Sequence, residues 1–510
     1  MKRKMIIKKW KYIVCLIFLK AAIITSCQST TLHDVVELQG FEKEVDSIMN
    51  VYHTVGAAIA VLKDGKVIYK KGFGYKDLEK KDTVNSTTVF GIGSCTKAFT
   101  AALFDIFEQK GLVQLKDSPK TYIPELSFYN DTMDEHIKIS DILSHRTGIP
   151  NIPTESSAVF FRSDDRNAII PRLKYIEPQA DVGETWIYNN YLYALAGRIT
   201  ERITKQDWED NLAEYIFTPL EMNTTYANVV TASKDPNFAL GYGVSRRDTI
   251  PMQVLPENFP TRDAGGNIYS SIDDMTKWLK VWMSQGYYKK QRVLSSKYIK
   301  EATGNQQLIN TDSITQQSQY YGYGWMNSMQ KGYRKIEHSG GISGYTSNVV
   351  YYPDKQLGII VLTNQNTAGT AFAITDRISE RFLDIAIETG SNEPYFSTVI
   401  SLEDPKTPTT INQTDPPTHS LVDLSGTYHH SGFGDIKVYL EEETLYAKVP
   451  FTTFRLSHEA GNRFQDHFTE RKSQVVGNFL NFTFQVNEQN IIHGILLNIS
   501  EAGILFEKID

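Results

Sequence analysis

The alternation of apolar and polar positions predicts β-strands near both ends of a central region of the chain. Residues 57–74 predict a β-hairpin, because two apolar runs flank the turn at Asp64 and Gly65. A second hairpin is predicted over residues 348–363, where the turn falls at residues 353–355. Most residues of the central region therefore lie between these two hairpins in the sequence.

Apolar residues recur at helical spacing between the predicted strands. Amphipathic helices are predicted over residues 98–107, 192–203 and 275–282, and a further helix over residues 374–382 closes the region. The polar run 304–319 is predicted to be a loop. Strands at both ends with helices between them imply an α+β fold, in which one antiparallel sheet is assembled from the two ends around an inserted helical region. A cleft between sheet and helices is where a site would form.

A second, smaller unit is predicted at the end of the chain. Residues 403–418 are rich in Pro, Thr, Asn and Asp, which is typical of a linker. Short alternating segments then follow at 426–428, 436–440, 445–449, 479–486, 491–499 and 504–508. They predict a small antiparallel β-barrel or sandwich. The predicted organisation is a main domain over residues 40–395, a linker over 396–419 and an all-β domain over 420–510.

The first residues predict export. Residues 1–26 have a basic start and an apolar core over 12–24 that Lys20 interrupts, and this core is too short for a comfortable transmembrane span. The stretch Ile-Thr-Ser-Cys that ends at Cys27 resembles the lipobox of bacterial lipoproteins, in which the cysteine is acylated. An ordinary signal peptide is the alternative. Lipidation would make residues 27–39 a tether to a lipid bilayer, facing the bacterial periplasm.

Composition narrows the range of partners. The chain has 510 residues, of which 41% are hydrophobic, and a formal net charge of -6. No global positive field attracts polyanions, so we expect no nucleic-acid partner. The three cysteines are Cys15, Cys27 and Cys95. Only Cys95 stays free after signal removal and acylation, so no intrachain disulfide is expected, and Cys95 is interpreted as a packed small residue.

Ser94 and Lys97 stand at the start of the helix predicted over residues 98–107. Positions i and i+3 are neighbours on a helix, so Ser94 Oγ and Lys97 Nζ share one face. This pairing sets a nucleophile beside a base. Ser-x-x-Lys is also frequent by chance, and a serine at a helix start is usually only a cap, so the motif needs support from the rest of the chain.

Two other stretches add polar groups at the ends of predicted elements. Tyr188 and Asn190 directly precede the helix 192–203, and a phenol beside an ammonium can share or lose its proton near neutrality. The alternative is that they only cap the helix. His338 and the glycine pair 340–341 end another predicted strand.

No metal and no organic cofactor is expected. The chain has no His-Glu-x-x-His motif, and His145 lies in a turn-rich stretch without a partner at metal-ligand spacing. We interpret His145 as structural. Gly265 and Gly266 lie in a predicted glycine-rich turn that leads into the helix 275–282. They match no phosphate-binding pattern and are interpreted as allowing close backbone approach to a cleft.

The three motifs together resemble the serine β-lactamase and penicillin-recognising family. The motifs are Ser94-x-x-Lys97, Tyr188-x-Asn190 and His338-x-Gly340, in that order. Flanking stretches at 143–148, 219–225 and 321–325 also match. The resemblance covers about residues 40–395 and is greatest to the class C-like branch, whose relatives include DD-peptidases, D-aminopeptidases and esterases. The C-terminal segment is similar to the small β-domain often appended to this branch.

The resemblance implies catalytic roles for Ser94, Lys97 and Tyr188. Ser94 would be the nucleophile of an acyl-enzyme, while Lys97 and Tyr188 would divide the role of base between them. Burial of Lys97 would disfavour its ammonium form. The resemblance also implies that Asn190 holds the substrate amide or the lysine, and that the backbone N–H groups of Ser94 and Gly341 stabilise the oxyanion.

His338 replaces the lysine of the commonest family motif, Lys-Thr-Gly. A neutral imidazole offers a hydrogen bond but no permanent charge for a substrate carboxylate, and this weakens the case for an efficient β-lactamase. We expect a serine hydrolase of small esters or of amides such as D-amino-acid peptides from the cell wall, with His338, Gly340 and Gly341 binding substrate. The alternatives are a β-lactamase or DD-carboxypeptidase, and a slowly acylated binding or sensing protein.

Overall fold

A computed structural model of the protein describes most of the chain. The described residues are 35–150, 165–244, 251–254, 263–366, 368–385, 412, 414–449, 452–468, 480–498 and 503–510. The predicted signal peptide and Cys27 lie outside the described residues, so export and lipidation stay predictions. Within the described part of the chain, no helix is both long enough and apolar enough to cross a membrane.

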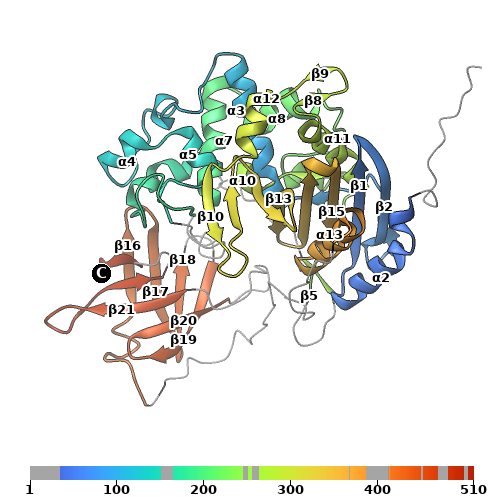
Figure 1. Ribbon diagram of the computed structural model, residues 1–510. Coiled ribbons are helices and arrows are strands. Elements are labelled where there is room, and N and C mark those ends of the chain that lie inside the picture. Colours follow the sequence, from blue (N-terminus) through green and yellow to red (C-terminus); the bar gives the residue numbers. More distant parts are fainter. Residues whose placement is uncertain are drawn as a thin grey trace, which may run out of the picture.

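Nine antiparallel strands form the main sheet of the described structure, in the order β10-β11-β12-β13-β14-β15-β1-β2-β3 (Figure 1). Their bounds are β1 Gly56–Lys63, β2 Lys66–Asp77, β3 Asp82–Thr83, β10 Gln307–Thr311, β11 Ser318–Tyr321, β12 Met326–Gln330, β13 Tyr333–Ile342, β14 Tyr345–Tyr352 and β15 Leu357–Thr363. β1 pairs with β15, with Ala57 opposite Thr363. Strands from the two ends of the domain are thus neighbours, which confirms the predicted sheet.

β1 is buried on both faces of the sheet. Ala57, Ile59 and Val61 pack in one apolar cluster with α2 (Phe41–Val51) and α13 (Ala368–Leu383). The alternate residues, Ala58, Ala60 and Leu62, face a larger cluster on the side of the inserted helices. This two-sided burial explains why β1 is an almost continuous apolar run rather than an alternating one.

The inserted region surrounds helix α3 (Thr96–Gln109), which is almost wholly buried. Phe99 on α3 stacks on Trp278 of α11 at 4.1 Å between ring centroids. Further elements are η2 Val36–Leu38, η3 Gly93–Cys95, η4 Pro119–Thr121, α4 Asp131–His136, α5 Ile139–Leu143, η5 Arg166–Tyr175, α7 Asn190–Thr204, α8 Trp208–Leu212, the π-helix η6 Ala213–Phe217, α9 Val229–Ala232, α10 Asp263–Gly266, α11 Ile272–Met283, α12 Ser296–Ala302 and η8 Pro353–Lys355. Short strand pairs are β4 Phe90–Gly91 with β7 Tyr269–Ser270, β5 Gly241–Val244 with β6 Pro251–Val254, and β8 Tyr287–Tyr288 with β9 Gln291–Arg292.

Two predictions about this region are wrong. Residues 304–319, predicted as a loop, contain β10 and the start of β11. This hairpin is the edge of the sheet and much of it faces water, so its strands carry polar residues and show no apolar alternation. The stretch at Gly265 and Gly266, predicted as a turn, is instead the short helix α10.

The C-terminal unit is a closed antiparallel barrel of eight strands, which confirms the all-β prediction (Figure 1, red). The strands are β16 Gly426–His430, β17 Gly434–Glu441, β18 Thr444–Val449, β19 Thr452–Ala460, β20 Arg463–Phe468, β21 Asn481–Val486, β22 Ile492–Leu497 and β23 Ile504–Lys508. β19 and β20 were not predicted, because buried polar residues such as Arg455 and Asp466 interrupt their apolar alternation. β16 pairs with β23 and closes the barrel.

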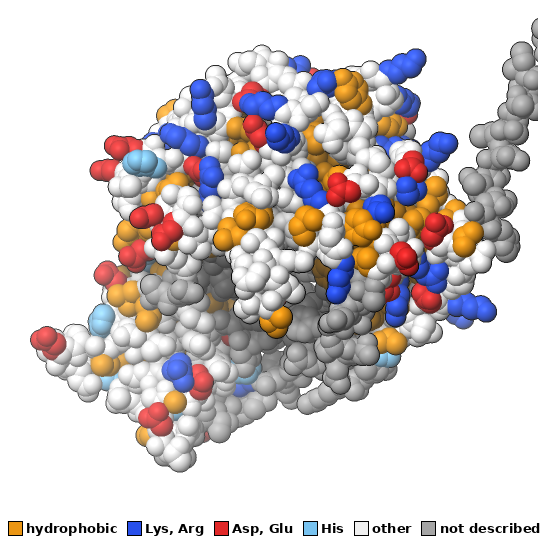
Figure 2. All heavy atoms as spheres, viewed as in Figure 1, with side chains coloured by type: hydrophobic (Ala, Val, Ile, Leu, Met, Phe, Trp, Pro, Cys, Tyr) orange, Lys and Arg blue, Asp and Glu red, His pale blue; other side chains and the backbone are white. Residues whose placement is uncertain are grey.

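The barrel lies at the end of the molecule away from α2 and α13 (Figure 1). It contacts the main domain at η5, where the ring of Tyr175 lies 5.6 Å from that of His430. A Cβ on Gly432 would come within 2.7 Å of the Tyr175 ring, so the barrel and the main domain approach each other closely here. Acidic and basic side chains are interspersed on the face of the molecule seen in Figure 2.

Candidate active site

The three predicted catalytic side chains meet at Ser94 Oγ. Ser94 lies in η3, directly before α3, and Lys97 lies in the first turn of α3. Lys97 Nζ donates to Ser94 Oγ at 3.1 Å. Tyr188, just before α7, donates its phenolic hydrogen to the same oxygen at 2.7 Å. Ser94 keeps partial exposure, so an alcohol, an amine and a phenol converge at a point that solvent reaches.

Lys97 is fully buried at the centre of this group. Besides Ser94, its Nζ donates to Asn190 Oδ1 at 2.6 Å and to the carbonyl oxygen of Gly265 at 2.8 Å. It also lies over the ring of Tyr188, 4.7 Å from the centroid. An ammonium has three N–H donors, and these three acceptors fix its position. Of the two roles predicted for Asn190, the structure has it holding the lysine.

Sequence reasoning missed the role of α10 in holding Lys97. Asp263 begins α10, is almost fully buried, and accepts hydrogen bonds from Arg166 at 2.6 Å and from Arg198 at 2.8 Å. The carbonyl of Gly265 is thereby held facing Lys97. A Cβ on Gly265 would lie 3.0 Å from the Asn190 carbonyl oxygen. In the sequence, the glycine pair that allows close backbone approach is the signal that points to this contact.

Of the two states predicted for the Tyr188 phenol, a shared or a lost proton, the structure favours the shared proton. Burial raises the pKa of Tyr188 above its ordinary value, and the hydrogen bond with Ser94 lowers it by less. The resting phenol therefore carries its proton and donates it toward Ser94 Oγ. In this state Tyr188 is an acid, and it becomes a base only after giving its proton away.

Two backbone segments meet beside Ser94, as the predicted oxyanion site requires. Gly93 has φ of +50°, and a Cβ built on it would lie 2.6 Å from the backbone nitrogen of Gly341 on β13. Gly340 is similarly close, since its Cβ would meet the carbonyl oxygen of Ile92 at 1.9 Å. These glycines let β13 approach η3, so that the backbone of Gly341 lies close to that of Gly93, the residue before Ser94.

We expect Gly93→Ala to lower kcat/KM by about 100-fold or more, because the new methyl group would push the Gly341 amide away from its position beside Ser94. The positive φ of Gly93 adds backbone strain. Ester turnover per folded enzyme measures the effect. Gly111→Ala is the matched control, since Gly111 also has a positive φ but no atom lies within 4 Å of its Cβ position. Equal turnover in the two variants would contradict the close approach.

His338 is buried, and both of its ring nitrogens have partners. Nδ1 lies 2.6 Å from the carbonyl oxygen of Ser339 and must donate to it, so Nε2 accepts from the hydroxyl of Tyr321 at 2.9 Å. Burial and the charge of Lys97 lower the pKa of His338 to about 3, so the ring is neutral. Its substrate-binding role stays a prediction, and a substrate would have to displace Tyr321 or Ser339 to reach a ring nitrogen.

Cys95 is a packed residue, as predicted. It is buried, and its Sγ donates to the carbonyl oxygen of His338 at 3.1 Å and contacts Ser347 Oγ at 3.2 Å. Burial raises the pKa of Cys95 to about 12. The thiol is therefore protonated at neutral pH and is no second nucleophile beside Ser94.

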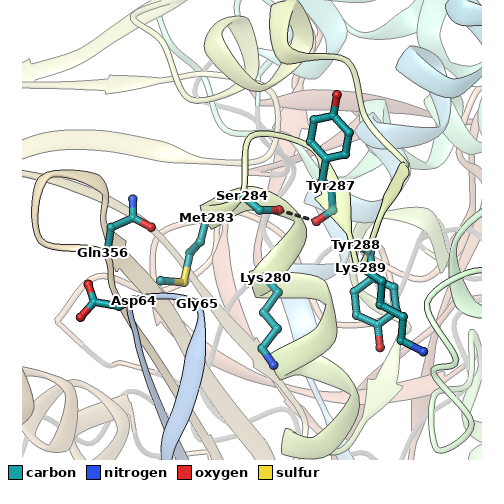
Figure 3. Close-up of a pocket in the computed structure, with 9 residues that line it drawn as sticks. All are labelled: Asp64, Gly65, Lys280, Met283, Ser284, Tyr287, Tyr288, Lys289 and Gln356. Atoms are coloured by element: carbon teal, nitrogen blue, oxygen red, sulfur yellow. Dashed lines mark hydrogen bonds between the residues drawn. The ribbon is translucent and has the colours of Figure 1, made fainter.

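A separate hollow of about 440 Å³ lies at the β1–β2 turn and the end of α11 (Figure 3). Lys280 and Lys289 line it together with Tyr287 and Tyr288, and Figure 3 shows that Lys280, Tyr288 and Lys289 point to the same side. None of the residues that contact Ser94 lines this hollow.

Comparison with known proteins agrees with this arrangement. The Beta-lactamase family model matches residues 41–380, and a domain of unknown function, DUF3471, matches residues 411–510. Protein flp of Staphylococcus aureus (strain MW2) is 27% identical over 331 residues, which are 64% of this chain and 64% of that protein. The chain thus spans just under two thirds of the length of that relative.

Two other proteins match over more of the chain. Unguisins hydrolase ungD of Aspergillus violaceofuscus is 26% identical over 455 residues, covering 80% of this chain and 78% of that enzyme. The solved structure of an octameric penicillin-binding protein homologue from Pyrococcus abyssi has the same fold, with a TM-score of 0.60 at 21% identity, over 92% of this chain and 100% of that one. The family model covers well over half of the sequence, so this chain belongs to the β-lactamase family.

Proposed function

We propose that this protein is a serine hydrolase that cleaves esters or amides through an acyl-enzyme on Ser94. The observation that carries the proposal is the convergence of Lys97 and Tyr188 on Ser94 Oγ at 3.1 and 2.7 Å. A serine hydroxyl is a weak nucleophile until an adjacent group takes its proton. Two such groups, one an amine and one a phenol, are within hydrogen-bond reach here.

The proposed reaction has two stages. Lys97 reacts as the neutral amine after its resting ammonium has lost a proton to solvent, and it takes the proton of Ser94 as Oγ attacks the substrate carbonyl carbon. Tyr188, protonated at rest, gives its proton to the leaving oxygen or nitrogen as that bond breaks, and it regains a proton from Lys97. Water then attacks the acyl carbon, a proton returns to Ser94 Oγ, and the free acid leaves. The amides of Ser94 and Gly341 would stabilise the oxyanion of both stages.

We also propose that the leaving group needs no carboxylate. The ring of His338 is neutral and both of its nitrogens are bonded within the protein, so it adds no positive charge to the cleft. A carboxylate transferred from water to this site gains no charged partner from His338, and burial of a carboxylate without such a partner costs free energy. This favours small neutral esters and amides, including D-amino-acid derivatives, over β-lactams and cell-wall peptides with a terminal carboxylate.

A matched pair of thioesters tests both proposals. Each carries the same N-acyl-D-alanyl group, and the leaving group is thioglycolic acid in one and its methyl ester in the other. We expect a burst of thiol release and an acyl mass adduct on Ser94, with kcat/KM for the methyl ester at least equal to that for the acid. A more than tenfold preference for the acid would refute the substrate proposal. A stable adduct without turnover would instead support a slowly acylated binding protein.

A further inference from the structure

His145 contacts the backbone on both sides of the catalytic tyrosine. The N–H of Ile187, which precedes Tyr188, donates to the carbonyl oxygen of His145 at 2.8 Å. The N–H of Asn189, which follows Tyr188, donates to His145 Nδ1 at 3.1 Å. The rings of His145 and Tyr188 also pack together, with 4.4 Å between their centroids. One residue therefore holds Tyr188 by its two neighbours and by its ring.

The hydrogen bond to Nδ1 defines the tautomer of His145. Because Nδ1 accepts from a backbone N–H, the proton of the neutral ring must be on Nε2. Nε2 is buried and has no hydrogen-bond partner within the described structure. Leaving a buried donor unpaired is unfavourable, so a phenyl ring would be more stable than an imidazole at this position if the ring only filled space. The function of an imidazole here is the acceptor that Nδ1 provides.

The surroundings of His145 restrict its movement. It is fully buried and has φ of +59°, a conformation that few residues other than glycine and asparagine adopt. The rings of Tyr193 and Tyr321 lie 5.1 and 4.8 Å from it. The Tyr193 hydroxyl donates to the carbonyl oxygen of Leu143, two residues before His145, at 2.7 Å. The turn that carries His145 is thus anchored to α7 as well as to the segment around Tyr188.

We propose that His145 is a positioning residue, which holds the Tyr188 phenol at hydrogen-bond distance from Ser94 Oγ through its bond to the Asn189 amide. This inference rests on the proposed acyl-enzyme function, and it gives a role to a histidine that the sequence had indicated to be structural only. It acts through Tyr188 and contacts no reacting atom. The hydrogen bond from Asn189 to Nδ1 is the contact that matters.

Two substitutions separate the acceptor from the ring. His145→Phe keeps an aromatic ring against Tyr188 but removes the acceptor, and we expect kcat to fall about 10- to 100-fold with KM nearly unchanged. His145→Asn offers a side-chain oxygen near the position of Nδ1 and tolerates the positive φ, so we expect it to lose less than about tenfold. His136→Phe, an exposed histidine on α4, is the control with unchanged kcat. Circular dichroism and the thermal midpoint report the folded fraction of each variant.

A double-mutant cycle with Tyr188→Phe identifies the route of the effect. If His145 acts through the Tyr188 hydroxyl, His145→Phe should change kcat less than about threefold once that hydroxyl is absent. A purely structural residue would cause the same fold-loss in both backgrounds, and this result would overturn the inference. His145→Asn losing as much as His145→Phe would also overturn it.

Labelling of the unaltered protein by a fluorophosphonate distinguishes a failure of the acyl-enzyme proposal from a failure of the proposed role of His145. If Ser94 is not labelled, the acyl-enzyme proposal fails and the inference about His145 fails with it. If Ser94 is labelled while the cycle is additive, only the positioning role of His145 is wrong. A labelled Ser94 with a non-additive cycle supports both.

Discussion

Ser94→Ala is expected to lower kcat/KM for a p-nitrophenyl ester by about 10⁴- to 10⁶-fold, to near the uncatalysed rate. The substitution removes the oxygen on which Lys97 and Tyr188 converge, so the remaining groups have no nucleophile to activate. Any residual rate would come from binding and from the oxyanion amides alone. Single-turnover hydrolysis with excess folded enzyme measures this loss without interference from product release.

The matched control for this substitution is Ser284→Ala. Ser284 is an exposed serine at the end of α11 and lines the separate hollow of Figure 3. Its removal should leave ester turnover unchanged. Substantial turnover by Ser94→Ala, with a circular dichroism spectrum like that of the unaltered protein, would falsify the assignment of Ser94 as nucleophile.

The second large effect is expected for Tyr188→Phe, which should lower kcat about 10²- to 10⁴-fold. The ring that packs on His145 is retained, so the thermal midpoint should change little, whereas the proton donor to the leaving group is lost. Pre-steady-state release of p-nitrophenol from an ester, compared with p-nitroaniline from the matching anilide, is the measurement. The anilide should suffer more, because an amine leaving group depends on protonation more than a phenolate does.

The pH dependence of the unaltered enzyme gives a second check on Tyr188. Burial raises the pKa of its phenol, so the neutral form is favoured and the proton is lost only at a pH above the usual phenol range. Between pH 5 and 9, the pH profile of kcat/KM should therefore contain no titration step that disappears in Tyr188→Phe. A limb near pH 7 that disappears in Tyr188→Phe would mean that the phenol is ionised during turnover at neutrality.

The proposed catalytic residues could be predicted from sequence because much of their arrangement is local. Ser94 and Lys97 are three positions apart at the start of a helix, so their contact follows from helical geometry. Tyr188 and Asn190 were predicted from their place at the start of a helix, observed as α7, but their approach to Lys97 needed the resemblance to a known family. Local spacing alone does not indicate which segments meet.

The remaining site contacts depend on packing between distant segments. The carbonyl of Gly265 reaches Lys97 because Arg166 and Arg198 anchor Asp263, and no local pattern encodes that arrangement. Tyr321 on β11 contacts His338 on β13, and this contact likewise arises from the order of the strands in the sheet. Backbone carbonyls carry no sequence signature at all, so a site built partly from them is only partly readable in advance.

The pairing of β1 with β15 also constrains when this protein can fold. Val55 donates to the side chain of Gln365 across 310 residues of chain, and Thr54 contacts Thr370 across 316. The ribosome must therefore release nearly the whole of this domain before β1, the third strand from one edge of the sheet, can pair with β15. Contacts of such long range slow folding, so the nascent domain stays open until nearly all of it has been synthesised.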